Sequence, residues 1–141
     1  MVSTTFTATF PARYDSLAKI GEFVIRASRA AGLDSSAIYA VQLAVDEACT
    51  NIIEHAYGGE GKGDIECTCT ESDDALTIRF HDQGHPFHPE QIPEPDLGAD
   101  LAERTPGGLG LYFIHKLMNE VHFSFSPDGG NTLSMVKWKQ P

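Results

Sequence analysis

The order in which strand-like and helix-like segments follow one another constrains the fold of this chain more than any other feature. Alternating apolar and polar residues, typical of half-buried strands, occupy five segments, and a three- to four-residue apolar repeat, typical of helices, occupies three. Two helical segments are consecutive, and four strands pair into two hairpins. A doubly wound sheet would need strands and helices to alternate. We therefore expect an α+β two-layer sandwich, with helices gathered on one face of a mixed, mostly antiparallel sheet.

The strands are predicted where apolar residues recur at every second position between turn residues. The first, 4–10, has Phe6, Ala8 and Phe10 on one side and threonines on the other, and Pro11 ends it. The others are 64–70, 75–82, 121–126 and 132–138. In the hairpin of 64–70 and 75–82, one apolar set should face another: Ile65, Cys67 and Cys69 against Leu76, Ile78 and Phe80.

Capping and breaking residues set the expected ends of the three helices. Asp15 is the expected N-cap of the first helix, and Gly32 ends it. The second helix begins after Asp34-Ser35-Ser36 and ends at Tyr57-Gly58-Gly59. The third follows the glycine-rich segment 107–110, and its apolar stripe is Leu111, Ile114, Met118 and Val121.

Prolines are concentrated in one stretch between the second hairpin strand and the third helix. Five of the eight prolines fall between Pro86 and Pro106, where neither a strand ladder nor a long helix is expected. A loop of this length inside a compact domain is usually a functional lid or a disordered linker, and here predicted elements flank both ends. The 141 residues suffice for one core and are too few for two, so we expect a single domain spanning 1–141.

The balance of charges excludes some partners. Asp and Glu number 20 against 10 Lys and Arg, which gives a formal net charge of −10. This field repels a nucleic-acid backbone, so direct nucleic-acid binding is not expected. A small anionic ligand is not excluded, because backbone N–H groups and a metal ion create a local positive site on an acidic protein. The acidity favours a partner protein with a basic face, whose association raised salt should slow.

Cysteine use and the lack of long apolar runs bear on the compartment. The cysteines Cys49, Cys67 and Cys69 are odd in number and have no disulfide spacing, which favours a reducing compartment. The first residues do not combine a basic start with an apolar stretch, and no run approaches the roughly 18 apolar residues of a membrane span. We expect a cytoplasmic protein without a membrane segment.

The second helix carries a polar column of three side chains. Glu47, Asn51 and His55 follow one another at steps of four, away from the apolar stripe. A carboxylate, an amide oxygen and an imidazole within reach of each other could hold a divalent cation or position a nucleophile. The alternative is an ordinary solvated helix face.

Two further segments have the residue types of a ligand site. Asp82 and Gly84 follow a strand end, where a carboxylate accepts a hydrogen bond from an exocyclic amine and a missing Cβ lets a flat ring approach. A tight Asp-Gly turn is the alternative. The segment Gly107–Leu111 opens the third helix, so its backbone N–H groups could bind phosphates, unless it is only a helix start. It lacks the context of a dinucleotide fingerprint and the Gly-Lys-Ser/Thr of a Walker loop.

Together these segments carry a resemblance to a known family. In chain order they are Glu47 to Tyr57, Asp82 to Phe87, Gly107 to Ile114, and Gly130 to Thr132. They resemble the N, G1, G2 and G3 boxes of the GHKL ATPases, which have the Bergerat fold, and in particular those of the anti-sigma-factor serine/threonine kinases. The similarity extends to Phe10-Pro-Ala-Arg13 and the first helix. The Pro-rich loop falls where that family has its ATP lid, here about 88–107.

The resemblance implies roles for the residues of the second helix. Asn51 would coordinate the Mg²⁺ that bridges the nucleotide phosphates. Glu47, one turn earlier, would be the general base for a serine hydroxyl. His55 matches the family pattern and is a candidate contact, although binding and packing roles both stay open for it.

It also implies roles for the other boxes. Asp82 would accept the adenine amino group, with Gly84 beneath the ring and Thr132 supporting the same edge. Arg104, by its place in the lid, is a candidate contact of the terminal phosphate, since phosphoryl transfer mostly needs positioning and charge neutralisation. Three successive residues are the candidate phosphate contacts: Gly108, Leu109 and Gly110.

The function that the resemblance implies is an ATP- and Mg²⁺-dependent anti-sigma regulator. Such a protein sequesters a sigma factor, phosphorylates a serine of an anti-anti-sigma antagonist, and forms a homodimer. A catalytically silent ATP-binding switch in another pathway is the alternative, and Glu47 beside Asn51 favours the kinase. A sensor histidine kinase is disfavoured because the boxes begin too early to leave room for its helical hairpin.

A cluster of histidines raises the possibility of a metal site. His81, His85 and His88 surround Asp82. They straddle a strand end and a proline-stiffened turn rather than one helix face, so zinc is disfavoured.

Overall fold

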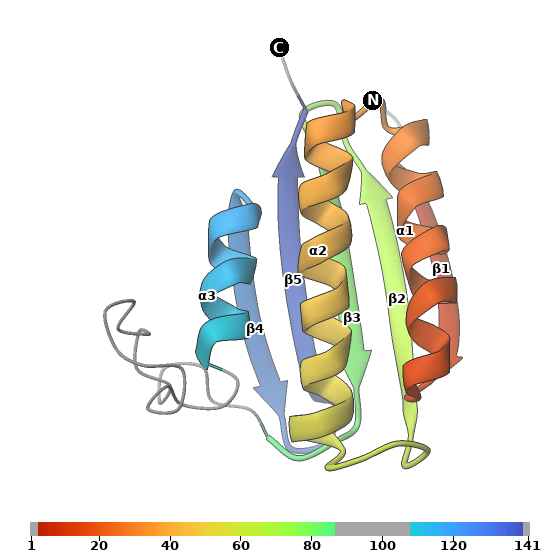
Figure 1. The fold of residues 1–141 in the computed structure, drawn as a ribbon, viewed down its shortest axis with the longest axis vertical. Helices are drawn as coiled ribbons and strands as arrows, with labels where there is room; N and C mark the ends of the chain where they lie inside the picture. Colours follow the sequence, from red (N-terminus) through yellow and green to blue (C-terminus); the bar gives the residue numbers. More distant parts are fainter. Residues whose placement is uncertain (1–2, 87–107, 140–141) are drawn as a thin grey trace.

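The computed structural model of the chain describes residues 3–86 and 108–139. Within them five strands form one sheet, in the order β1-β2-β3-β5-β4, and every pairing between neighbours is antiparallel. Figure 1 shows the helices on one face of this sheet. The predicted α+β two-layer fold is confirmed, with a sheet that is antiparallel throughout its described strands. The strands are β1 (Thr4–Pro11), β2 (Asp64–Glu71), β3 (Ala75–Asp82), β4 (Glu120–Ser126) and β5 (Gly130–Trp138).

The helical layer consists of α1 (Leu17–Ala30), α2 (Ser35–Asn51) and α3 (Gly108–Leu117). A 3₁₀ turn, η1 (Tyr14–Ser16), precedes α1, and a π-helical turn, η2 (Ile52–Ala56), continues α2. In Figure 1, α1 and α3 flank α2 on opposite sides. None of the helices in the described residues is both long and apolar enough to cross a lipid bilayer.

The start of α1 differs from the prediction and its end agrees with it, while α2 begins two residues earlier than expected, at Ser35. Asp15 is not the N-cap: it lies inside η1, where its carboxylate pairs with Arg13 (Nε to Oδ1, 3.3 Å), and Ser16 takes the N-cap position. Gly32 follows the end of α1 with φ +81°, a conformation that glycine adopts without strain. Asp34 caps α2 by accepting a hydrogen bond from the Ala37 N–H at 2.8 Å.

The predicted third helix is shorter than its apolar stripe. α3 ends at Leu117, and Val121 belongs to β4 instead. Lys137 of β5 donates its ammonium group to the Leu117 carbonyl at 2.7 Å, and the Asn119 N–H donates to the Val136 carbonyl at 2.9 Å. A cation is favourable at the C-terminal end of a helix, so these bonds fasten this end of α3 to the sheet.

The core lies between the helices and the inner face of the sheet. The predicted facing of the β2–β3 hairpin is confirmed, since Cys67 pairs with Phe80 and Cys69 with Ile78, and all four side chains are buried. In β1 the predicted inner set faces buried partners, yet Phe6 remains 44% exposed. The Cys67 and Cys69 thiols are free.

Tyr57 joins three segments at the end of α2. Its hydroxyl donates to the Asp64 carbonyl at 2.6 Å and accepts from the Gln83 N–H at 3.0 Å. Gly63 allows this contact, because a Cβ at that position would lie 2.4 Å from the Tyr57 ring. Burial raises the pKa of Tyr57, so its hydroxyl stays a donor at neutral pH. The end of α2 is thereby tied to the start of β2 and to the chain that leaves β3.

We predict that Tyr57→Phe lowers the free energy of unfolding by about 1–2 kcal/mol, because one hydroxyl bonds two backbone groups of different segments. Urea unfolding at neutral pH measures this. Tyr39→Phe is the matched control, since Tyr39 is 63% exposed and should tolerate the change. Equal stability of the two variants would contradict the role given to the Tyr57 hydroxyl.

Candidate functional site

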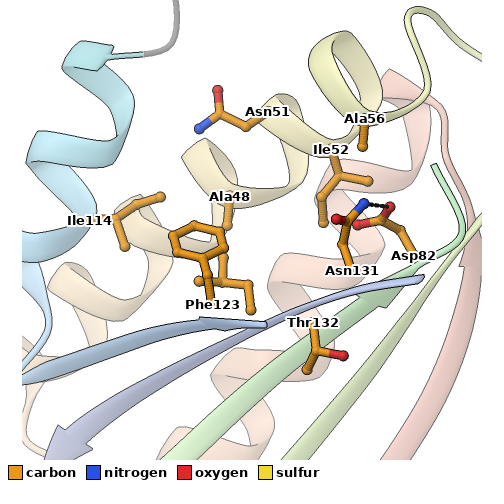
Figure 2. Close-up of a pocket in the computed structure, with 10 residues that line it drawn as sticks. Ala48, Asn51, Ile52, Ala56, Asp82, Ile114, Phe123, Asn131 and Thr132 are labelled. Atoms are coloured by element: carbon orange, nitrogen blue, oxygen red, sulfur yellow. Dashed lines mark hydrogen bonds between the residues drawn. The ribbon is translucent and has the colours of Figure 1, made fainter. Parts of the chain in front are cut away.

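A small cavity lies where the end of α2 meets α3 and the sheet (Figure 2). Its volume is about 30 Å³, which is the share of one water molecule. It is closed on the sheet side by β3, β4 and β5. The lining residues are Ala48, Asn51, Ile52, Ala56, Asp82, Ile114, Phe123, Asn131, Thr132 and Leu133.

A buried carboxylate and a buried amide pair in this lining. Asp82 and Asn131 are 4% and 6% exposed, and they face each other across the β3–β5 register. Asn131 Nδ2 donates to Asp82 Oδ1 at 2.9 Å and to the His85 carbonyl at 2.8 Å. The Gly84 N–H also donates to Asp82 Oδ1, at 2.9 Å. No described residue donates to Asp82 Oδ2, so this oxygen is left as an acceptor for a ligand.

Asn131 is the site residue that sequence reasoning missed. It lies between Gly130 and Thr132, in the segment that resembles the G3 box, and the resemblance implied no role for it. Its role follows from its register with Asp82, and register was not predicted. An asparagine at the inward-facing position of a strand was the available signal, because a buried amide needs a specific partner.

Glycines near Asp82 allow close backbone approaches. A Cβ on Gly84 would lie 2.5 Å from the Ala56 carbonyl oxygen, and the next residue, His85, donates its N–H to the same oxygen at 2.7 Å. A Cβ on Gly130, whose φ is +82°, would lie 2.2 Å from the Asp82 carbonyl oxygen. Gly84 is therefore needed for packing against the end of α2, whatever its relation to a ligand.

The three residues of the predicted polar column lie in different surroundings. Asn51, the last residue of α2, lines the cavity, and its Nδ2 atom is buried with no hydrogen-bond partner in the described part of the chain. Glu47 lies one turn earlier, partly buried and outside the lining. His55 is exposed and lies in η2, where the Tyr57 N–H bonds to the Ile52 carbonyl, a wider step than in an α-helix. The structure does not bring His55 to the cavity.

The Thr132 hydroxyl points to the other face of the sheet from Asp82 and Asn131 (Figure 2). It hydrogen-bonds His81 Nδ1 at 3.1 Å, while His81 Nε2 lies 3.2 Å from Gln83 Nε2. Both nitrogens of His81 therefore have protein partners. His88 lies outside the described residues, and within 3–86 and 108–139 no three His, Cys, Asp or Glu side chains are grouped to hold a metal ion.

The glycine-rich segment opens a helix, as predicted. Gly108, Leu109 and Gly110 form the first turn of α3, whose backbone N–H groups have no partner within the helix. In Figure 1 this end of α3 and the end of α2 lie toward the same end of the molecule. Arg104 and the expected lid, about 88–107, fall outside the described residues.

The sequence that forms this arrangement matches a known protein family. The profile of the histidine kinase-like ATPase domain matches residues 10–137. The chain belongs to this ATPase family. The match covers every strand and helix of the described structure except the outer part of β1 and the last residue of β5.

Among curated proteins, this ATPase domain is similar to the serine-protein kinase RsbW of two bacteria. It is 37% identical to the Bacillus velezensis protein over 103 residues, which are 70% of this chain and 62% of that protein. It is 36% identical to the Listeria monocytogenes protein over 138 residues, which are 94% of this chain and 85% of that protein.

A solved structure supports the fold. The RsbU and RsbW domains of Rv1364c from Mycobacterium tuberculosis align with a TM-score of 0.68 at 18% identity. The alignment covers 98% of this chain and 33% of that one. At this identity the likeness concerns the ATPase fold.

We predict that Gly84→Ala destabilises the domain by about 2–3 kcal/mol, because the new methyl group would overlap the Ala56 backbone. Gly21→Ala is the control: an added Cβ there has no atom within 4 Å, so the domain should gain about 0.5–1 kcal/mol from the better helix former. Thermal unfolding distinguishes the two. Equal effects of the two substitutions would refute the packing role of Gly84.

Proposed function

We propose that this protein is an ATP- and Mg²⁺-dependent serine-protein kinase that acts in a partner switch, binding a sigma factor and phosphorylating an anti-anti-sigma antagonist. The name serine-protein kinase RsbW of the relatives supports the activity. The observation that carries the nucleotide site is the buried Asp82 carboxylate, which has one oxygen held by two protein donors and the other free toward the cavity.

The adenine end of the site would be read by Asp82. Its Oδ1 atom is occupied by the Gly84 and Asn131 donors, so Oδ2 would accept a hydrogen from the exocyclic amino group. Gly84 beneath the ring and Thr132 at the same edge stay predictions, and for Thr132 the contact would have to involve its backbone or a water. Asn131 joins the proposal as the residue that fixes the Asp82 carboxylate.

ATP binding would have to widen the cavity. Ligand pockets commonly enclose about 300 Å³ or more, against about 30 Å³ here. Apolar side chains make up much of the lining, including Ile114 of α3 and Phe123 of β4. We propose that α3 moves away from α2 when the base enters, since α3 borders the cavity through Ile114.

The phosphate end would be bound by α3 and by Asn51. The N–H groups of Gly108, Leu109 and Gly110 begin a helix and can donate to phosphate oxygens. Asn51 fits a role beside them, because its buried Nδ2 atom has no partner among the residues that the structure describes and its oxygen is a ligand type that Mg²⁺ accepts. A bound Mg²⁺ would neutralise charge on the phosphates. We also propose a lid at about 88–107, in which Arg104 would contact the terminal phosphate.

Glu47 would supply the base for phosphoryl transfer. It lies one helical turn before Asn51, is partly buried, and makes no hydrogen bond or ion pair with a described residue. It would accept the proton of a substrate serine as the serine oxygen bonds to the γ-phosphorus and the bond from that phosphorus to the ADP oxygen breaks.

The partner assignments rest on the family. We propose a sigma factor and an antagonist as partners and a homodimer as the assembly, in the cytoplasm and without direct nucleic-acid contact. The net charge of −10 supports partners with basic faces. If Glu47 had no catalytic role, the chain would have the alternative function of a catalytically silent ATP-binding switch.

We predict that Asp82→Asn weakens ATP binding about tenfold and raises the affinity for GTP. The Gly84 and Asn131 donors should hold the new amide oxygen at the Oδ1 position, which leaves an N–H₂ donor where Oδ2 accepted. GTP has a carbonyl oxygen where ATP has the amino group. Calorimetric titration with both nucleotides measures this, with exposed Asp73→Asn as the charge-matched control. Unchanged preference for ATP would contradict the adenine assignment.

We predict that Glu47→Gln abolishes serine phosphorylation but leaves Mg-ATP affinity within about twofold, because only the proton acceptor is lost.

Asn51→Ala should abolish Mg-ATP binding and preserve the fold, as measured by circular dichroism. Labelled ATP, Mg²⁺ and an antagonist that co-purifies with the chain provide the assay, and exposed Glu66→Gln is the control. If the wild type bound ATP but formed no phosphoserine, the result would favour the alternative function, a catalytically silent ATP-binding switch.

A further inference from the structure

In Figure 1, α1 lies on the side of α2 away from α3. A groove between α1 and α2 lies on that side, away from the proposed nucleotide cavity. It encloses about 570 Å³. Its floor contains Ile20, Val45 and Cys49, which are buried, and burial raises the pKa of the Cys49 thiol, so the floor is uncharged. The remaining lining residues are Leu17, Ala18, Gly21, Glu22, Ile25, Gln42, Leu43 and Asp46.

Gly21 keeps this groove open at a cost to the fold. It lies in the middle of α1, where glycine is less favourable than alanine. No atom lies within 4 Å of the position where its Cβ would be, so close packing does not require a glycine. The lack of a side chain therefore has its effect on the groove, which a larger residue would fill from the α1 side.

The rims of the groove combine apolar and acidic groups. Leu43, which lines the groove from α2, is 40% exposed. The exposed carboxyl groups of Glu22 on α1 and Asp46 on α2 line the groove, and no Lys or Arg does. The groove thus has an apolar floor and negative rims on a chain of net charge −10.

We infer that this groove binds an amphipathic helix of a partner protein, with an aliphatic side chain over Gly21 and Lys or Arg residues beside Glu22 and Asp46. A helix fits better than a strand, because the groove lies between two helices and offers no free strand edge, and a helix satisfies its own backbone groups. The inference does not depend on nucleotide binding, since the groove and the cavity lie on opposite sides of α2.

The test uses the whole chain labelled with ¹⁵N and a helical peptide of leucine and lysine, about 14 residues long. We expect chemical-shift changes confined to the groove-lining residues of α1 and α2. Glu22→Gln with Asp46→Asn should weaken binding about fivefold, whereas the exposed pair Asp73→Asn with Asp128→Asn should leave it unchanged. A leucine and glutamate peptide should not bind.

Filling the groove provides the second test. Gly21→Leu should weaken peptide binding at least tenfold, and the Glu22 and Asp46 variants keep the inference testable if that protein does not fold. The inference would be overturned if the two double variants weakened peptide binding equally, or if the chemical-shift changes lay away from the groove. A wild-type dimer that Gly21→Leu converts to a monomer in sedimentation would also overturn it, because the occupant would then be a second copy of the chain.

Discussion

The close approach of the chain after β3 to the end of α2 is the contact on which the site depends. Gly84 lies against Ala56 with no room for a Cβ, and the His85 N–H bonds to the Ala56 carbonyl. This contact joins the helical layer to the sheet at one end of the molecule, and Tyr57 reinforces it. The Asp82 carboxylate is held in the same place, since Gly84 and Asn131 both donate to it. Packing and the proposed ligand recognition therefore involve the same few residues.

The π-helical turn after Asn51 has a related effect. An extra residue in the turn lets Tyr57 reach both the start of β2 and the chain after β3. It also ends the regular spacing of the polar column, so Glu47 and Asn51 keep their helical relation while His55 turns outward. π-turns of this kind are common at functional sites. Here the turn separates the proposed site residues Glu47 and Asn51 from His55, which continues their four-residue spacing in the sequence but not their position in the structure.

Much of the fold could be predicted because local patterns agree with the tertiary structure. The alternation in β2 and β3 and the helix stop at Gly32 are local signals, and both predictions were confirmed. The prediction of Asp15 as an N-cap was wrong because a 3₁₀ turn that contains Asp15 precedes α1, so the N-cap position falls on Ser16. Asn131 was missed because its importance arises from a strand register. Glycines show the same limit. Gly84 was expected beneath a ligand ring and Gly21 was given no role, yet a Cβ on Gly84 would meet the Ala56 backbone and one on Gly21 would meet open space.

The fastening of α3 has a mechanical consequence. Its last carbonyl is held by Lys137, and the Asn119 N–H that follows is bonded to β5, so the C-terminal end of the helix cannot slide along the sheet without breaking both bonds. If α3 rotates with both bonds kept, Leu117 is the pivot, and Ile114, about one turn from it, would move less than the start of the helix. A small outward movement of Ile114 at the cavity would then go with a larger displacement of the first turn.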